Sequence, residues 1–245
     1  MKASRLEFRL RMVILAAILT VGMWAPWVGA GQRIPLLEWL ALEISRLWLL
    51  TFAAATPAVI VLATLIAAKG ALLRVWGTAW LGPATVLNSE MTAGPVMADG
   101  PYRYVRNPLY LGLWSMTVAL AFLMPPTGAL LVLIAVPVFL LRLILGEEVF
   151  LAGQLGEPYL AYKRAVPRIF PRLRTNLAPS GRKPRWLRGV LSELTSIGIF
   201  LTFATLSWSY NNEWMIRAIL VSFGISLMVR GFLPREDEQF PTPAK

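Results

Sequence analysis

The feature that most constrains the fold is a series of long apolar segments separated by polar stretches. A helix of about 20 apolar residues crosses the roughly 30 Å hydrocarbon core of a bilayer. Hydrophobic residues make up 57% of the chain, against about 45–50% in soluble domains. The sequence therefore predicts an all-α, polytopic membrane helix bundle with about six transmembrane helices. The expected spans are residues 12–28, 47–68 (continuing as helix towards Trp80), 109–124, 127–145, 190–208 and 214–233.

The distribution of basic residues sets the expected orientation. With six spans and both termini in the cytoplasm, all of the 24 lysines and arginines except Arg33, Arg46 and Arg217 lie on one side. Cytoplasmic loops of membrane proteins carry such an excess of Lys and Arg. The net charge of +11 is therefore assigned to orientation and to anionic headgroups of the lipid bilayer, and no nucleic-acid partner is expected.

The chain contains neither cysteine nor histidine. This excludes disulfides, thiol nucleophiles and zinc held by Cys or His, and we expect no metal site. It also removes the usual general base near neutral pH. Any chemistry must use carboxylates, cationic side chains, hydroxyls or the backbone.

The first candidate segment is residues 100–112, GPYRYVRNPLYLG. Asn107 precedes Pro108, which suits the first turn of a helix, so a structured loop is expected to enter the third span here. A helix N-terminus offers free N–H groups to a carboxylate or phosphate. Tyr102, Tyr104 and Tyr110 are suited to covering a purine or a cation. The alternative is an interfacial anchor of Arg and Tyr.

Two further segments follow the fourth span. Glu147 and Glu148 are predicted at its inner end, where adjacent carboxylates are costly unless solvated, paired or used. A solvated helix end is the alternative. Residues 155–171, LGEPYLAYKRAVPRIFP, place Tyr159 and Tyr162 on one face of a short helix and then return in extended form. An amphipathic interfacial helix has the same pattern.

In this order, the segments resemble the integral membrane methyltransferases of the isoprenylcysteine carboxyl methyltransferase and phospholipid N-methyltransferase group. Residues 73–82 also resemble the stretch before the core of that family, and the resemblance covers about residues 47–171. It implies S-adenosylmethionine as cofactor and S-adenosylhomocysteine as product. The implied acceptor is lipophilic and enters from the bilayer: a phospholipid amine, a prenylcysteine-like carboxylate or a small thiol.

The resemblance also implies a site. The cofactor would lie between residues 106–112 and the Glu147–Glu148 pair, under residues 159–171. Arg168, which would orient an anionic acceptor, and Glu148 are the implied catalytic residues. The implied cofactor-binding residues are Tyr102, Val105, Arg106, Asn107, Pro108, Tyr110, Leu111, Gly112, Glu147, Glu148, Tyr159 and Tyr162.

Asn107 departs from the family, which usually has His at this position. An amide can donate and accept hydrogen bonds but cannot carry a proton at neutral pH. A catalytically degenerate member is therefore one alternative. A non-enzymatic transporter or structural subunit is another, although the expected spans are nearly free of mid-span charge, unlike those of transporters.

The expected organisation places the methyltransferase core at the centre of the chain. The C-terminal hairpin lies outside the resemblance, and packing on the core, lipid binding and dimerisation are all open for it, as is the oligomeric state. Residues 166–171, VPRIFP, look more like bacterial members of the family, which implies a bacterial inner membrane with the active site facing the cytoplasm. The expected divisions are 1–46 (first helix and connecting loop), 47–171 (core), 172–189 (basic linker), 190–233 (transmembrane hairpin) and 234–245 (polar tail).

Overall fold

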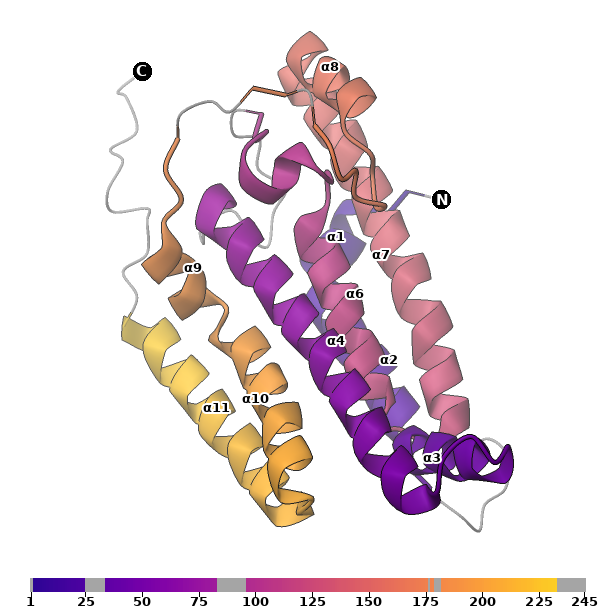
Figure 1. The fold of residues 1–245 in the computed structure, drawn as a ribbon. Coiled ribbons are helices and arrows are strands. Elements are labelled where there is room, and N and C mark those ends of the chain that lie inside the picture. Colours follow the sequence, from indigo (N-terminus) through magenta and orange to yellow (C-terminus); the bar gives the residue numbers. More distant parts are fainter. Residues whose placement is uncertain (1, 25–33, 83–95, 176, 179–181, 233–245) are drawn as a thin grey trace.

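A computed structural model describes residues 2–24, 34–82, 96–175, 177–178 and 182–232. These described residues form helices and connecting segments, with no strand among them, so the predicted all-α class is confirmed (Figure 1). The helices are α1 (Arg5–Arg9), α2 (Arg11–Trp24), α3 (Leu36–Arg46), α4 (Phe52–Leu81), the 3-10 helix η1 (Gly100–Arg103), α6 (Pro108–Ala121), α7 (Pro126–Leu155), α8 (Glu157–Ala165), α9 (Trp186–Ser192), α10 (Leu194–Ser209) and α11 (Asn212–Phe232).

Three of the described helices are long and apolar enough to cross a membrane, namely Phe52–Leu81, Pro126–Leu155 and Asn212–Val229. The pair α9 and α10, bent by 68°, makes a fourth if it counts as one span. Helices α2 and α6 are apolar but have 14 residues each, about 21 Å of helix. The chain is a membrane helix bundle, while the count of six and the cytoplasmic termini stay predictions.

Local sequence explains where several helices begin and end. Pro108 and Pro126 occupy the first turns of α6 and α7, where their missing N–H groups cost nothing. Helix α7 ends at Gly156, whose φ of 59° favours glycine. The apolar segment predicted at 127–145 is therefore only part of a 30-residue helix. The amphipathic α3 falls where a connecting loop was expected.

Glycines allow two pairs of helices to approach closely. A Cβ atom on Gly128 of α7 would lie 1.8 Å from the carbonyl oxygen of Gly22 in α2. A Cβ atom on Gly70 of α4 would lie 2.9 Å from the carbonyl oxygen of Gly112 in α6. Small residues at helix crossings are a common packing device in membranes, where no hydrophobic effect drives helices together.

The C-terminal hairpin of α10 and α11 packs on the bundle. Phe203 of α10 is buried in one cluster with Val59 and Ala63 of α4 and with Phe122. The hydroxyl of Thr64 donates to the carbonyl oxygen of Phe203 at 3.2 Å. Of the roles left open for this hairpin, packing on the core is therefore observed.

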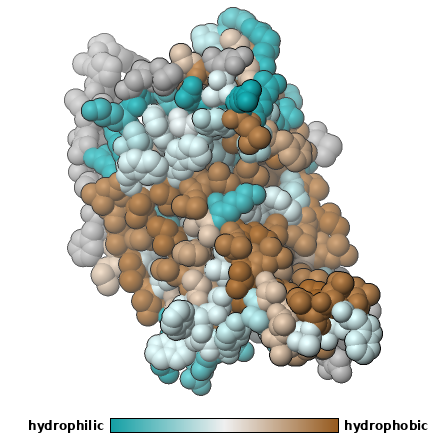
Figure 2. All heavy atoms as spheres, in the orientation of Figure 1, coloured by the Kyte–Doolittle hydropathy of each residue, from teal (hydrophilic) through white to brown (hydrophobic). Residues whose placement is uncertain are grey.

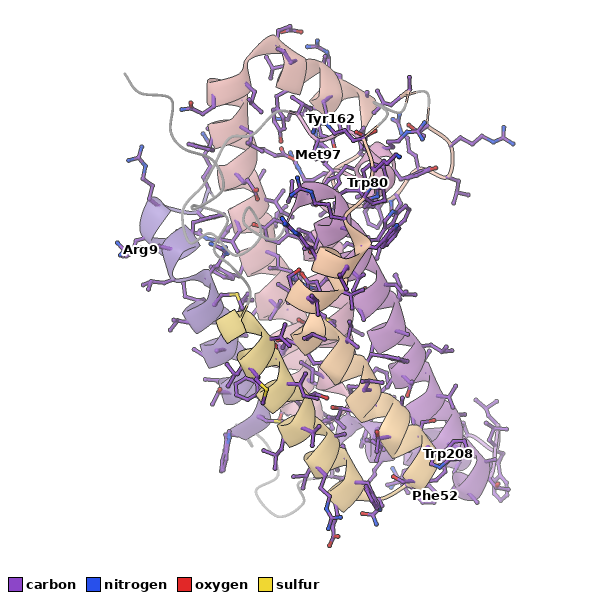
Figure 3. The ribbon with its side chains drawn as sticks, turned by 90° about the vertical axis from the view of Figure 1, so that its left-hand side faces the viewer. Arg9, Phe52, Trp80, Met97, Tyr162 and Trp208 are labelled. Atoms are coloured by element: carbon purple, nitrogen blue, oxygen red, sulfur yellow. The ribbon has the colours of Figure 1, made fainter. Side chains whose placement is uncertain are left out.

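The polar segments gather at one end of the bundle. Helix α8 and η1 lie at the same end, whereas α3 lies at the opposite one (Figure 1). An apolar belt crosses the middle of the visible face, and hydrophilic residues are concentrated above it (Figure 2). Tyr162, Met97 and Trp80 lie at the polar end, while Trp208 and Phe52 lie at the other (Figure 3). This division fits a bundle that spans a bilayer with its candidate site at one surface.

Candidate active site

The first candidate segment forms a compact entry into α6. Residues Gly100–Arg103 make η1, and Pro101 and Tyr102 are buried within it. Asn107 then precedes α6, as predicted, with Pro108 as the first helical residue. The Asn107 side chain makes no cap hydrogen bond to the helix. Its amide is directed elsewhere in the site.

Glu147 and Glu148 lie inside α7, which continues to Leu155. They follow the apolar span directly, and the helix continues through polar residues beyond them, so the pair does not end the helix. Glu148 is only 3% exposed, so the solvated helix end is also excluded for this residue. A buried carboxylate in this setting requires cationic partners.

Glu148 is the centre of an ion cluster that joins all three candidate segments. Arg168 binds it in a bidentate manner, with Nε 2.9 Å from Oε1 and Nη2 2.8 Å from Oε2. Arg106 Nη2 lies 3.0 Å from Oε1, and Lys163 Nζ lies 3.5 Å from Oε2. Hydrogen bonding to Glu148 raises the pKa of Arg168. Three cationic side chains thus surround one carboxylate and leave an excess of positive charge.

The segment after α8 was predicted to return in extended form. Val166 is extended, with φ of −115° and ψ of 131°, but the chain bends at Val166 and at Arg168–Phe170, and the segment forms backbone hydrogen bonds with the entry to α6. The Arg106 N–H donates to the carbonyl oxygen of Pro167 at 2.9 Å, and the Arg172 N–H donates to that of Tyr104 at 3.0 Å. The Asn107 side-chain amide donates to the carbonyl oxygen of Arg168 at 3.0 Å. Asn107 therefore fixes the backbone that carries Arg168.

Glu147 faces a different partner from its neighbour. The Tyr110 hydroxyl donates to Glu147 Oε2 at 3.0 Å, which links α6 to α7. Adjacent residues on a helix point about 100° apart, so two consecutive carboxylates serve two neighbouring regions.

Tyr159 and Tyr162 of α8 lie together under the segment that follows this helix. Their ring centroids are 6.1 Å apart, and both rings are buried, as the predicted common face implies. The Tyr162 hydroxyl donates to the carbonyl oxygen of Tyr102 at 2.9 Å. Burial raises the pKa of Tyr159 to about 12 and also raises the pKa of Tyr162. Both phenols are therefore neutral near pH 7.

A cavity of about 120 Å³ lies between α6 and α7, and its lining includes the residues that follow Arg106 and Arg168 in the chain. Asn107, which precedes α6, Tyr110 of α6 and Ile169 of the segment after α8 form part of its wall. The remaining wall is apolar and includes Pro137, which interrupts the backbone bonding of α7. The full lining is Asn107, Tyr110, Leu111, Trp114, Pro137, Leu140, Leu141, Ile144 and Ile169.

The structure separates the implied site residues into groups. Arg106, Glu148 and Arg168 meet in the ion cluster, and Tyr110 meets Glu147. Asn107, Tyr110 and Leu111 line the cavity. Others are buried within the entry loop or against neighbouring helices: Tyr102, Val105, Pro108 and Gly112. Tyr159 and Tyr162 support the entry loop from α8.

Two groups of residues were not among the predicted site residues. Lys163 lies within residues 155–171, but no sequence pattern distinguishes it as a site residue. Trp114 and Pro137 lie within apolar spans, and the sequence around them does not indicate a cavity. Only the packing of α6 on α7 places them beside the site.

Comparison with known families gives a match over residues 58–157, to the model described as phospholipid methyltransferase. The match covers less than half of the chain and shows that this segment is similar to the phospholipid methyltransferase family. The resemblance predicted from the motifs is confirmed for these residues. Neither a curated protein nor a solved structure matches the chain significantly. The matched segment ends before Tyr159. Lys163 and Arg168 therefore lie outside it, and the folding of the chain brings them to the site.

Proposed function

We propose that the chain is an S-adenosylmethionine-dependent membrane methyltransferase acting on a lipophilic acceptor. One observation carries the proposal: Glu148 draws Arg106, Lys163 and Arg168 together from three segments, and Asn107 and Ile169, the chain neighbours of Arg106 and Arg168, line a cavity with a largely apolar wall. The family that residues 58–157 resemble supports methylation of a lipid, and a phospholipid amine is the acceptor that we favour.

The residues present fit the cofactor. Among the described residues, no hydrogen-bond partner lies within reach of Arg106 Nε, although this side chain is 7% exposed. A buried donor without a partner is costly, and a ligand carboxylate would satisfy it. Glu147 offers carboxyl oxygens that can accept hydrogen bonds from an ammonium or from ribose hydroxyls. When bound, S-adenosylmethionine supplies a methyl group that is already activated on its sulfonium.

The residues of the chain itself therefore have to bind the donor and the acceptor, orient them and exclude water. Arg168 is about one third exposed, so it can hold a phosphate or carboxylate of the acceptor while it remains paired with Glu148. The largely apolar cavity accommodates hydrocarbon near this charge. Asn107 holds the Arg168 backbone and transfers no proton. An acceptor that already bears a lone pair needs only such positioning.

Titration of the purified protein with S-adenosylmethionine by calorimetry tests the donor. We expect saturable binding and competition by S-adenosylhomocysteine. Folded protein that shows no binding would overturn the proposal. Membranes supplied with methyl-labelled S-adenosylmethionine should then yield a labelled lipid. Binding without any labelled product would favour a catalytically degenerate member.

Replacing Tyr110 by phenylalanine should weaken S-adenosylmethionine binding about tenfold. The substitution removes the donor to Glu147 Oε2 while leaving the ring in place, and a hydrogen bond to a charged group contributes about 1.5–3 kcal/mol. Calorimetry measures the effect. Tyr210→Phe is the control, because Tyr210 is an exposed tyrosine at the end of α10. Equal affinities for both variants would remove Tyr110 from the site.

A further inference from the structure

The hairpin outside residues 58–157 is joined to α4 by a buried ion pair. Glu193, between α9 and α10, is 3% exposed. Arg74 Nε lies 2.7 Å from Glu193 Oε2, and Arg74 Nη2 lies 2.8 Å from Oε1. This bidentate geometry fixes the guanidinium in both position and orientation.

Two hydroxyls complete the coordination of the Glu193 carboxylate. Thr78 Oγ1 donates to Oε1 at 2.8 Å, and Ser196 Oγ donates to Oε2 at 2.7 Å. Each carboxylate oxygen therefore accepts one bond from Arg74 and one from a hydroxyl. A buried carboxylate satisfied in this way is held rigidly, and removal of its charge is costly.

The stem of Arg74 lies against α6. A Cβ atom on Gly112 would be 2.7 Å from Arg74 Cγ and 3.3 Å from the Arg74 backbone nitrogen. Gly112 follows directly after Tyr110 and Leu111, which line the cavity. The Arg74 side chain is thus fixed by the hairpin at its guanidinium and contacts the first turns of α6 along its stem.

We propose that Glu193 is a positioning residue for the methyl-transfer site. By fixing Arg74 against Gly112, it sets the position of the first turns of α6 relative to α4. These turns carry Asn107 and Tyr110, so the hairpin is required for the geometry of the site. This inference rests on the proposed function for its effect on the cofactor, but its effect on α6 is independent of it.

The test compares Glu193→Gln with Thr64→Val. The first substitution removes the charge that holds Arg74. The second removes a different bond between the hairpin and α4, the one from Thr64 to Phe203, ten residues or about 15 Å before Arg74 along the helix. We expect Glu193→Gln to weaken S-adenosylmethionine binding at least about tenfold, because small displacements in such sites have large effects. Thr64→Val should retain wild-type affinity.

Hydrogen–deuterium exchange of residues 107–112 gives a readout that needs no cofactor. Exchange should rise in Glu193→Gln and stay unchanged in Thr64→Val. If Glu193→Gln fails to fold, the double variant Arg74→Met with Glu193→Met leaves no unpaired charge and should show the same changes. Unchanged exchange in the folded variant, or equal changes in Thr64→Val, would overturn the proposal. Wild-type protein that binds no S-adenosylmethionine would overturn the proposed function instead.

Discussion

Glu148→Ala should abolish S-adenosylmethionine binding and lower the free energy of unfolding by about 3–5 kcal/mol. The substitution leaves Arg106, whose side chain is 7% exposed, without its ion-pair partner. It also releases Arg168 and Lys163, which hold α8 and the segment after it against α7. Cofactor affinity and stability should therefore fall together, since the carboxylate both pairs the cations and assembles the site.

Calorimetry and unfolding in sodium dodecyl sulfate measure the two effects. Glu157→Ala is the matched control, because Glu157 also pairs with an arginine, Arg164, but both side chains are more than 60% exposed. An exposed pair contributes about 0–1 kcal/mol, so this variant should be close to wild type. Two variants with the same stability and the same affinity would contradict the central role of Glu148.

Gly128→Leu should lower the free energy of unfolding by about 3 kcal/mol or more, because the new side chain cannot be accommodated at the crossing of α2 and α7. A Cβ atom alone would lie 1.8 Å from the Gly22 carbonyl oxygen, and backbone cannot move aside as the end of a flexible side chain can. Helix α2 must then separate from α7. Unfolding in sodium dodecyl sulfate and the yield of membrane-inserted protein measure the loss.

Gly153→Leu controls for the helix and for the substituted residue type. Gly153 also lies in α7, but a Cβ atom there would meet nothing within 4 Å. Leucine favours helix over glycine by roughly 0.5–1 kcal/mol, so this variant should be as stable as wild type or more stable. Wild-type stability of Gly128→Leu would mean that α2 and α7 do not cross as closely as the structure has them.

The sequence by itself determined the class of fold and the family that residues 58–157 resemble. Apolar runs near the length needed for a bilayer require helices, because every backbone polar group in lipid must be satisfied within its own segment. The motifs at residues 100–112, at Glu147–Glu148 and at 155–171 were recognisable because their prolines, glycines and charges constrain local structure. Their order along the chain was enough to indicate the family that residues 58–157 match.

The tertiary structure alone decided which of these side chains meet. Glu148 pairs with Arg168 across 20 positions and with Arg106 across a helical hairpin, and no local pattern encodes such partners. The same holds for Glu193 and Arg74, which are 119 positions apart. Which buried charged side chains form pairs depends on which of them lie close together once the helices have packed. The sequence thus specifies apolar helices and the motifs through local rules, whereas packing brings the motifs together as a site and attaches the C-terminal hairpin to the bundle.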